Sequence, residues 1–256
     1  MLNHATNHTQ DRCTQCDKKS MSIKESCYWC SNPATGIEHI PPKGLFPKGH
    51  RKNLITVRSC NEHNQELSKI DERMRFYMTS MGGDSEIAKS HFENKAVRGL
   101  RRKESRGLAI DIVTSKFTTA EGNTLFKEDA TNWDSYFEKI IRGLYFYHFK
   151  KNLDDRTHFF SNRISMLMLS ANAHFYYHTI EHKLLKYWIN GNAENKEIFD
   201  YKYYYSASEN QFFIIMKFYE NHEVIGISLP KGKNIDDFGL DIEEYKQLIE
   251  EINEKQ

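Results

Sequence analysis

Two short pairs of soft metal ligands constrain this chain more than any other feature. Cys27 and Cys30 form the first pair and Cys60 and His63 the second, and two residues separate the members of each pair. Such spacers let one turn present both side chains to a single Zn²⁺, which takes four Cys or His ligands in a tetrahedron. Because so short a segment buries little surface, the metal would supply stability to it. The spacing therefore predicts a structural zinc site.

A rival pairing exists, because Cys13 and Cys16 form another pair with the same spacing. These two cysteines and the first pair could bind one zinc as a ribbon-like site. We favour the set that includes Cys60 and His63, because that second pair would otherwise have no explanation. Cys13 and Cys16, with His4 and His8 nearby, are then left for a second metal, a redox pair or no role in a polar segment.

A carboxylate and an imidazole, Glu38 and His39, lie between the two ligand pairs. Phosphodiester hydrolysis needs an activated water, neutralised phosphate charge and help for the leaving oxygen, and a hard divalent ion with one imidazole can provide them. Glu38 offers the ion an oxygen ligand, and the alternation of a strand turns His39 the other way, towards an attacking water. Asn64, directly after the second pair, would reach the same ion.

The whole pattern, from Cys27 through Glu38 and Asn53 to Asn64, resembles the HNH endonuclease family in its zinc-containing ββα-metal form. The stretch 38–47, EHIPPKGLFP, is similar to a bacterial subgroup with an EHxPPKxLFP motif. The resemblance covers roughly residues 25–77. It implies that His39 is the general base, that Asn53 buttresses the loop, and that Glu38 and Asn64 hold a catalytic Mg²⁺ or Mn²⁺. It further implies DNA as the substrate and bacterial defence against phage as a setting.

Three positions depart from the usual pattern of that family. Glu38 stands where Asp is more usual, Asn64 stands where His is frequent, and His63 replaces the usual fourth Cys. Zinc accepts the last change. The first two change the side chains that the family supplies to the catalytic ion.

The local pattern predicts three parts: a polar N-terminal segment 1–24, a nuclease module 25–80 and an accessory region 81–256. In the module, turn residues precede a short β-branched strand at 54–57, and a helix follows over about 61–77. Asn64, Ser68 and Asp71 share one face of that helix. Ser68 and Asp71 either orient the substrate or metal shell or, as we expect, are ordinary polar helix positions.

The accessory region is expected to make the chain an α+β protein, with helices followed by a small antiparallel sheet. Aromatic-rich periodicity predicts a helix over 134–151 and a long or broken helix over 161–190. Segments 201–205, 211–219 and 224–229 alternate or run apolar, which predicts the strands of the sheet.

Charge is uneven along a chain whose formal net charge is only +1. Phosphate contacts are predicted from two basic groups, and the second could equally be a solvated helix face. The first group lies in the turn-rich loop of the module and consists of Lys43, Lys48, Arg51 and Lys52. The second group follows the module and consists of Arg98, Arg101, Arg102 and Lys103.

Composition sets the remaining expectations. All five cysteines lie in the first 60 residues, which suits metal binding in a reducing compartment. The polar start and the lack of a long apolar run predict a cytoplasmic protein without a membrane span. A homodimer or a regulatory protein partner stays open. The alternative function is a nucleic-acid-binding or partner-regulated subunit whose HNH core is weak or inactive.

Overall fold

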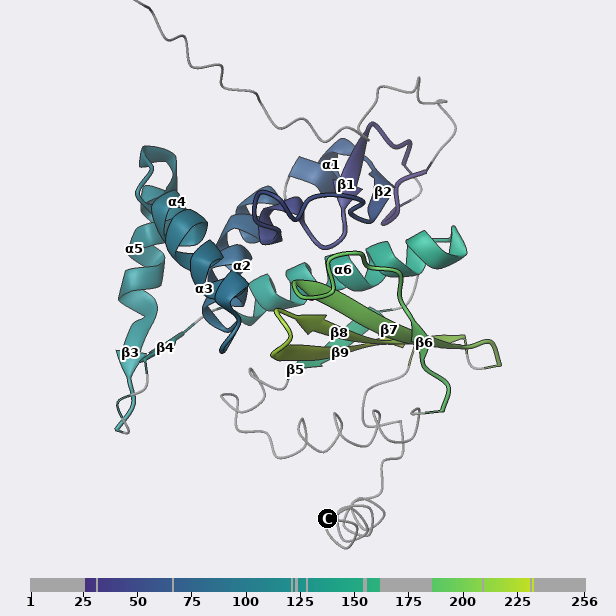
Figure 1. Ribbon diagram of the computed structural model, residues 1–256. Coiled ribbons are helices and arrows are strands. Elements are labelled where there is room, and N and C mark those ends of the chain that lie inside the picture. The colour runs from purple at the N-terminus through teal and green to yellow at the C-terminus, as the bar shows by residue number, and fades with distance from the viewer. Residues whose placement is uncertain are drawn as a thin grey trace, which may run out of the picture.

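The computed structural model describes residues 26–161 and 186–232, apart from 31, 66, 121, 123, 128, 154, 155, 209 and 231. The expected α+β class is confirmed. One long helix, α6 (Ala130–Phe149), runs through the middle of the molecule. A hairpin with two helices lies on one side of it and a five-stranded antiparallel sheet lies on the other (Figure 1).

The N-terminal hairpin is formed by β1 (Gly36–His39) and β2 (Thr56–Ser59), which pair antiparallel with Glu38 opposite Val57. Strand β2 begins two residues later than predicted, although the Ile40 N–H still donates to Ile55 O at 2.9 Å. The connecting loop contains a single 3₁₀ turn, η1 (Lys43–Leu45).

Two helices follow the hairpin where the sequence predicted one. They are α1 (Asn61–Gln65) and α2 (Ser68–Ser80). Met74 and Met78 of α2 are fully buried, and Phe76 and Tyr77 are almost so. The interruption between the helices lets α2 direct this apolar face at α6, instead of continuing the path that the second ligand pair sets for α1.

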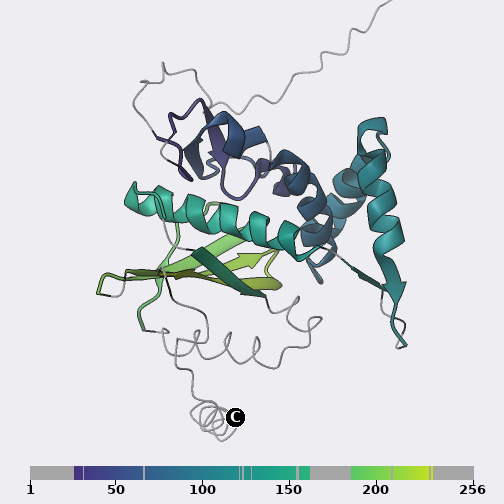
Figure 2. The same cartoon turned by 180° about the vertical axis from the view of Figure 1, so that it is seen from behind.

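The segment after α2 was not predicted in detail, and it forms an arm beside the hairpin and α6 (Figures 1 and 2). It begins with α3, which the Ser85 side chain caps by accepting from Ala88 N. The chain continues into a π-helical turn, which often marks a functional position. The elements are α3 (Glu86–His91), η2 (Phe92–Val97), α4 (Arg98–Leu100), η3 (Lys103–Ser105), α5 (Arg106–Ser115), β3 (Lys116–Thr118) and β4 (Thr124–Phe126).

The main sheet has the order β5-β9-β8-β7-β6, with every neighbouring pair antiparallel. The three predicted strands are present as β7, β8 and β9, and the predicted helix near 134–151 is α6. Most of the helix expected over 161–190 lies outside the described residues, but its two ends are strands. The sheet consists of β5 (Arg156–Ser161), β6 (Ile189–Asn190), β7 (Phe199–Ser206), β8 (Gln211–Phe218) and β9 (His222–Leu229).

Helix α6 touches both of its neighbours closely. A Cβ added at Gly143 would lie 2.5 Å from the Ile40 side chain, and one added at Gly226 would lie 2.6 Å from Ile141. One cluster of buried residues therefore runs from Cys27 to Val224 and crosses the predicted module boundary at residue 80, where α2 ends. Within the described ranges, no helix is both long enough and apolar enough to cross a bilayer.

Candidate metal centre and active site

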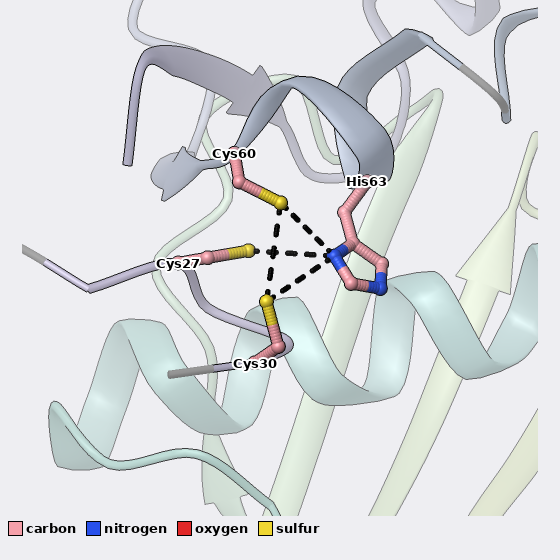
Figure 3. A group of neighbouring side chains, drawn as sticks. All are labelled: Cys27, Cys30, Cys60 and His63. Atoms are coloured by element: carbon pink, nitrogen blue, oxygen red, sulfur yellow. Dashed lines mark hydrogen bonds between the residues drawn. The ribbon is translucent and has the colours of Figure 1, made fainter. Parts of the chain in front are cut away.

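Four side chains from the two predicted ligand pairs meet at one point (Figure 3). Cys27 and Cys30 come from the turn before β1, Cys60 follows β2, and His63 lies in α1. Their sulfur atoms and one imidazole nitrogen all lie within 4.8 Å of one another. Antiparallel pairing of β1 and β2 causes this meeting, because it brings the two ends of the segment 27–63 together.

The distances in this group suit a tetrahedral ion. The His63 Nδ1 lies 3.8 Å from Cys27 Sγ, 3.5 Å from Cys30 Sγ and 3.2 Å from Cys60 Sγ. Cys30 Sγ and Cys60 Sγ are 3.9 Å apart. Zinc bonds of about 2.3 Å to sulfur and about 2.0–2.1 Å to nitrogen separate ligand atoms by about 3.8 and 3.5 Å. The group can therefore hold a metal ion, and its donor set is compatible with zinc.

The pKa values of two thiols in this group are shifted in opposite directions. Burial raises the pKa of Cys30 to about 11. Burial also acts on Cys27, but backbone hydrogen bonds from Cys60, Trp29 and Cys30 outweigh it and lower the pKa of that thiol. A bound cation would favour the thiolate form of Cys30. The rival ligands Cys13 and Cys16 lie outside the described residues.

Residues outside the four-ligand group contact it and hold it in place. The Trp29 ring stacks on the His63 ring with centroids 5.0 Å apart, and the Arg142 guanidinium of α6 lies 5.2 Å from the Trp29 ring centroid. The Asn152 amide donates to Cys27 O at 2.9 Å. The imidazole ligand is thus oriented through contacts that reach α6 and the segment after it.

Glu38 faces the interior and is only 7% exposed. Its Oε1 accepts the His39 backbone N–H at 3.0 Å, and its Oε2 lies 3.4 Å from Nζ of Lys139. The same ammonium donates to Asp71 of α2, at 2.8 Å to Oδ2 and 3.1 Å to Oδ1. Burial raises the pKa of both carboxyl groups, although Lys139 acts in the opposite direction. We call these three residues the carboxylate–lysine cluster.

His39 is half-buried and neutral. Burial, followed by the charges of Lys43, Arg51 and Lys139, lowers its pKa to about 4. Its Nε2 is buried and has no hydrogen-bond partner among the described residues. Because the imidazole is neutral, one of its ring nitrogens carries a lone pair at neutral pH, which a general base requires.

The two asparagines of the predicted site lie at different ends of the hairpin. Asn64 donates weakly to Ile37 O at 3.4 Å, and a Cβ on Gly36 would lie 3.0 Å from its Nδ2. Asn53 has a positive φ of 49° in the loop, and its amide donates to Glu194 at 2.6 Å. Asn53 is thus tied to the accessory region.

The catalytic ion expected from the HNH resemblance does not fit this arrangement. Both oxygens of Glu38 already have partners, the Glu38 side chain is almost inaccessible, and Lys139 brings a positive charge to it. Mg²⁺ keeps several waters and needs near-octahedral space, which such a carboxylate does not offer. A hydrated ion could therefore bind to Glu38 only after displacement of Lys139.

The first predicted basic group forms one side of a groove of about 570 Å³. Lys48 and Arg51 from the loop face Lys95 from η2 across it. Burial lowers the pKa of Lys95, and so do the nearby charges of Arg75, Arg102, Arg51 and Lys48. Lys43 lies in η1 near His39, whereas Lys52 is exposed and its carbonyl accepts from Asn195 at 3.2 Å. The loop thus presents cations both to the groove and to His39.

The second predicted basic group is exposed on the arm. Arg101, Arg102 and Lys103 line a shallow hollow of about 560 Å³ with Ile110 and Val113, whose residues are 52% and 70% exposed. Arg98 is exposed on α4. The basic side chains can contact phosphate, and the exposed Ile110 and Val113 beside them could equally contact a protein partner.

The sequence prediction missed the most informative contact of the site. Asp71 was expected to be an ordinary polar helix position. Lys139, which lies in the aromatic-rich helix predicted over 134–151, was not singled out. The one available signal was a lysine between the apolar neighbours Phe137, Ile140 and Ile141, a position that packing buries. The chain matches no family model, and no curated protein or solved structure matches it.

Proposed function

We propose that this chain is an endonuclease of HNH type that hydrolyses phosphodiester bonds in DNA. The observation that carries the proposal is the placement of His39 at the end of a hairpin whose base is closed by the Cys27, Cys30, Cys60 and His63 group. This is the combination that the sequence resemblance implies, and a zinc ion on the four ligands would keep the hairpin and α1 in register.

His39 is the residue that we assign to the base. Its lowered pKa keeps the imidazole neutral at physiological pH, so that the ring nitrogen that carries the lone pair can accept a proton from a water as the water attacks phosphorus. The bond from phosphorus to the leaving oxygen then breaks, and solvent protonates that oxygen. Lys43 and Arg51, whose charges act on His39, would neutralise the phosphate.

Nucleic acid is the substrate class that the charges favour. The groove between the loop and η2 collects Lys48, Arg51 and Lys95, and the exposed cations of the arm continue the basic character of the chain beyond the module. Sequence-independent affinity for DNA comes from such phosphate contacts.

A second candidate function is favoured by one contact, the pairing of Glu38 with Lys139. If that pairing is permanent, no catalytic ion binds, and the chain is a nucleic-acid-binding or partner-regulated subunit with an inactive core. The two candidates differ in whether the purified chain cuts DNA at all.

Plasmid cleavage separates these candidates. Supercoiled plasmid is incubated with the zinc-loaded full chain alone, with Mg²⁺, with Mn²⁺ and with EDTA, and nicked and linear products are quantified. An endonuclease gives either product, and the His39→Ala variant does not. DNA binding without cleavage under every condition, with zinc bound, would replace the first proposal by the second.

A further inference from the structure

The groove between the loop and η2 gathers cations without a matching number of acids. Lys48 and Arg51 line it from the loop, and Lys95 lines it from η2. Among the described residues that line it, Glu86 is the one acid, and its carboxylate already contacts the Lys89 ammonium at 2.8 Å. The lining therefore carries a net positive charge, and we call this place the basic groove.

Lys95 is half-buried in the wall of the basic groove. In the part of the chain that the structure describes, neither Lys95 nor Lys48 forms a salt bridge. An ammonium that is partly withdrawn from water, with other cations nearby, is unfavourable unless an anion compensates it. An anionic ligand in the groove would supply the compensation that no described carboxylate gives to Lys95.

The loop side of the basic groove is fixed by its own contacts. Arg51 Nε donates to Phe46 O at 2.9 Å, and His50 Nδ1 lies 3.0 Å from Glu197 Oε1. On the other side, Lys95 belongs to a π-helical turn, a feature that is frequent at functional sites. Charges that are held in place before a ligand arrives cost less entropy when it binds. The basic groove is therefore organised in advance for an anion.

The donors of the basic groove suit a phosphate group. A guanidinium and two ammonium groups are the side chains that proteins use for phosphate oxygens. Ser90 adds a hydroxyl: its Oγ accepts from Asn94 Nδ2 at 3.3 Å, so its own hydrogen is left for another acceptor. The volume of about 570 Å³ is in the range of small-ligand sites, about 300–1,000 Å³. It accommodates one nucleotide unit.

We propose that the basic groove binds a phosphate group of the nucleic acid other than the one that is hydrolysed, with Lys95, Lys48 and Arg51 as its cations. The inference rests on the proposed function for its ligand, which is nucleic acid. It adds a second phosphate position to that function. Because the loop follows directly after His39 at the end of β1, a strand held in the groove is placed beside the assigned base.

The phosphate has two sources on a nucleic acid. A backbone diester carries one negative charge, whereas a terminal monoester carries about 1.5 to 2 at neutral pH. Both present the same acceptor oxygens to the groove. The binding site is therefore tested first with inorganic phosphate, and the source is tested with oligonucleotides.

The zinc-loaded full chain, without Mg²⁺ or Mn²⁺, is titrated with inorganic phosphate at constant ionic strength by isothermal titration calorimetry. We expect one phosphate to bind per chain. Lys95→Met should weaken this binding about 10- to 100-fold, the usual effect of losing one hydrogen bond to a charged group. Lys48→Met should weaken it less, because Lys48 is exposed to water.

Lys217→Met is the matched control. It also removes one ammonium, but Lys217 lies in β8, pairs with Glu223 at 2.7 Å and is not part of the groove lining. This variant should bind phosphate as the parent chain does.

Urea unfolding without phosphate separates a ligand-binding role of Lys95 from a structural one. Lys95→Met removes a half-buried charge without a described carboxylate partner, so the variant should be at least as stable as the parent chain. If Lys95→Met is instead destabilised, its weaker binding does not count. The exposed Lys48→Met then decides.

Oligonucleotides identify the source of the phosphate. A single strand that ends in a phosphate is compared with the same strand ending in a hydroxyl, each with and without inorganic phosphate as competitor. Tighter binding of the phosphorylated strand, lost in Lys95→Met, assigns the groove to a terminal monoester. Equal affinities that inorganic phosphate reduces in the parent chain but not in Lys95→Met assign it to a backbone diester.

Two results would overturn the proposal: a parent chain that binds no inorganic phosphate, or Lys95→Met and Lys48→Met variants that both bind it as the parent does. Cleavage is not measured in these titrations. His39→Ala should retain phosphate binding while it loses cleavage, so a negative result in either assay leaves the other proposal standing.

Discussion

The Cys27, Cys30, Cys60 and His63 group and the carboxylate–lysine cluster lie beside the same hairpin, yet they are built in opposite ways. The first takes all its members from the segment 27–63 and brings four metal ligands together. The second takes Glu38 from that segment but is completed by Asp71 and by Lys139 of a distant helix. The first group offers four donor atoms to a cation, whereas the second already contains the Lys139 ammonium.

This difference teaches that a motif guarantees a site only when the motif contains every member of it. Two ligand pairs with fixed spacing and one strand pairing are enough to place four donor atoms. The environment of Glu38 depends instead on which side chain α6 directs at it, and a carboxylate behaves as a metal ligand or as half of a salt bridge accordingly.

The largest effect is expected from Cys60→Ala. Removing one ligand of a structural zinc site removes folding energy, which reaches about 10 kcal/mol or more in small zinc modules. We expect loss of bound zinc and of the cooperative unfolding of the hairpin and α1, measured by zinc analysis and circular dichroism. Cys13→Ala is the control and should retain zinc. Reversed behaviour of the two variants would assign the zinc to the rival ligand set.

His39→Ala should abolish cleavage and leave the zinc group intact. A general base contributes on the order of 10²- to 10⁴-fold to the rate, and no other imidazole is assigned to this role. Initial rates on plasmid give the effect, and zinc content shows that the frame is unchanged. His148→Gln, in α6 where the imidazole bonds to the Tyr201 hydroxyl at 2.9 Å, should cut at the parental rate. Parental rates for both variants would remove His39 from the mechanism.

Lys139→Met should destabilise the fold by about 3–5 kcal/mol, since breaking a buried ion pair leaves carboxylates without compensation. Urea unfolding at neutral pH measures this difference. Lys89→Met is a suitable reference, because Lys89 pairs with Glu86 on an exposed helix face, where a surface change stays within about 0.5 kcal/mol. Equal stabilities would mean that the buried pair contributes nothing net.

The contact between the loop and the accessory region should make stability depend on pH. His91 Nδ1 donates to the Tyr219 hydroxyl at 3.1 Å, and that hydroxyl donates to Leu45 O at 2.6 Å. Burial, with nearby Arg75, lowers the pKa of His91 from 6.5 to about 4. Between these values the unfolded chain binds a proton that the folded chain does not, so stability falls as pH drops from about 6.5 to about 4.

Replacing His91 with Gln should flatten part of this fall. His39 and His148, whose pKa values burial also lowers to about 4, should contribute to the fall in the same direction. Urea midpoints at several pH values provide the measurement. An identical pH profile in the parent and in His91→Gln would show that His91 is not held neutral by the fold.

The smallest effect on the fold is expected from the exposed cations of the arm. Replacement of Arg98, Arg101, Arg102 and Lys103 by Ala should weaken DNA binding and lower the log–log salt slope by up to ~0.9 for each lost phosphate contact. Cleavage at saturating DNA should persist. An unchanged slope would instead assign this surface, with its exposed Ile110 and Val113, to a protein partner.

Some elements of the fold could be predicted from the sequence and others could not. The meeting of Cys27, Cys30, Cys60 and His63, the hairpin, α6 and three strands of the sheet followed from spacing and periodicity, which are local properties. The division of the helix after His63 into α1 and α2, the strand β5 and the arm were not recovered. These depend on what each segment packs against, and no periodic signal distinguishes them.

By itself, the sequence determined the metal-ligand frame and the positions of Glu38 and His39 on one strand, because short spacers and strand alternation fix geometry over a few residues. Only the tertiary structure decided what those two residues face. It placed Lys139 against Glu38 and Asp71, and it left His39 half-buried, neutral and near Lys43 and Arg51. The reason is that charge and solvent access at a site are set by all the elements packed around it, and most of these are distant in sequence.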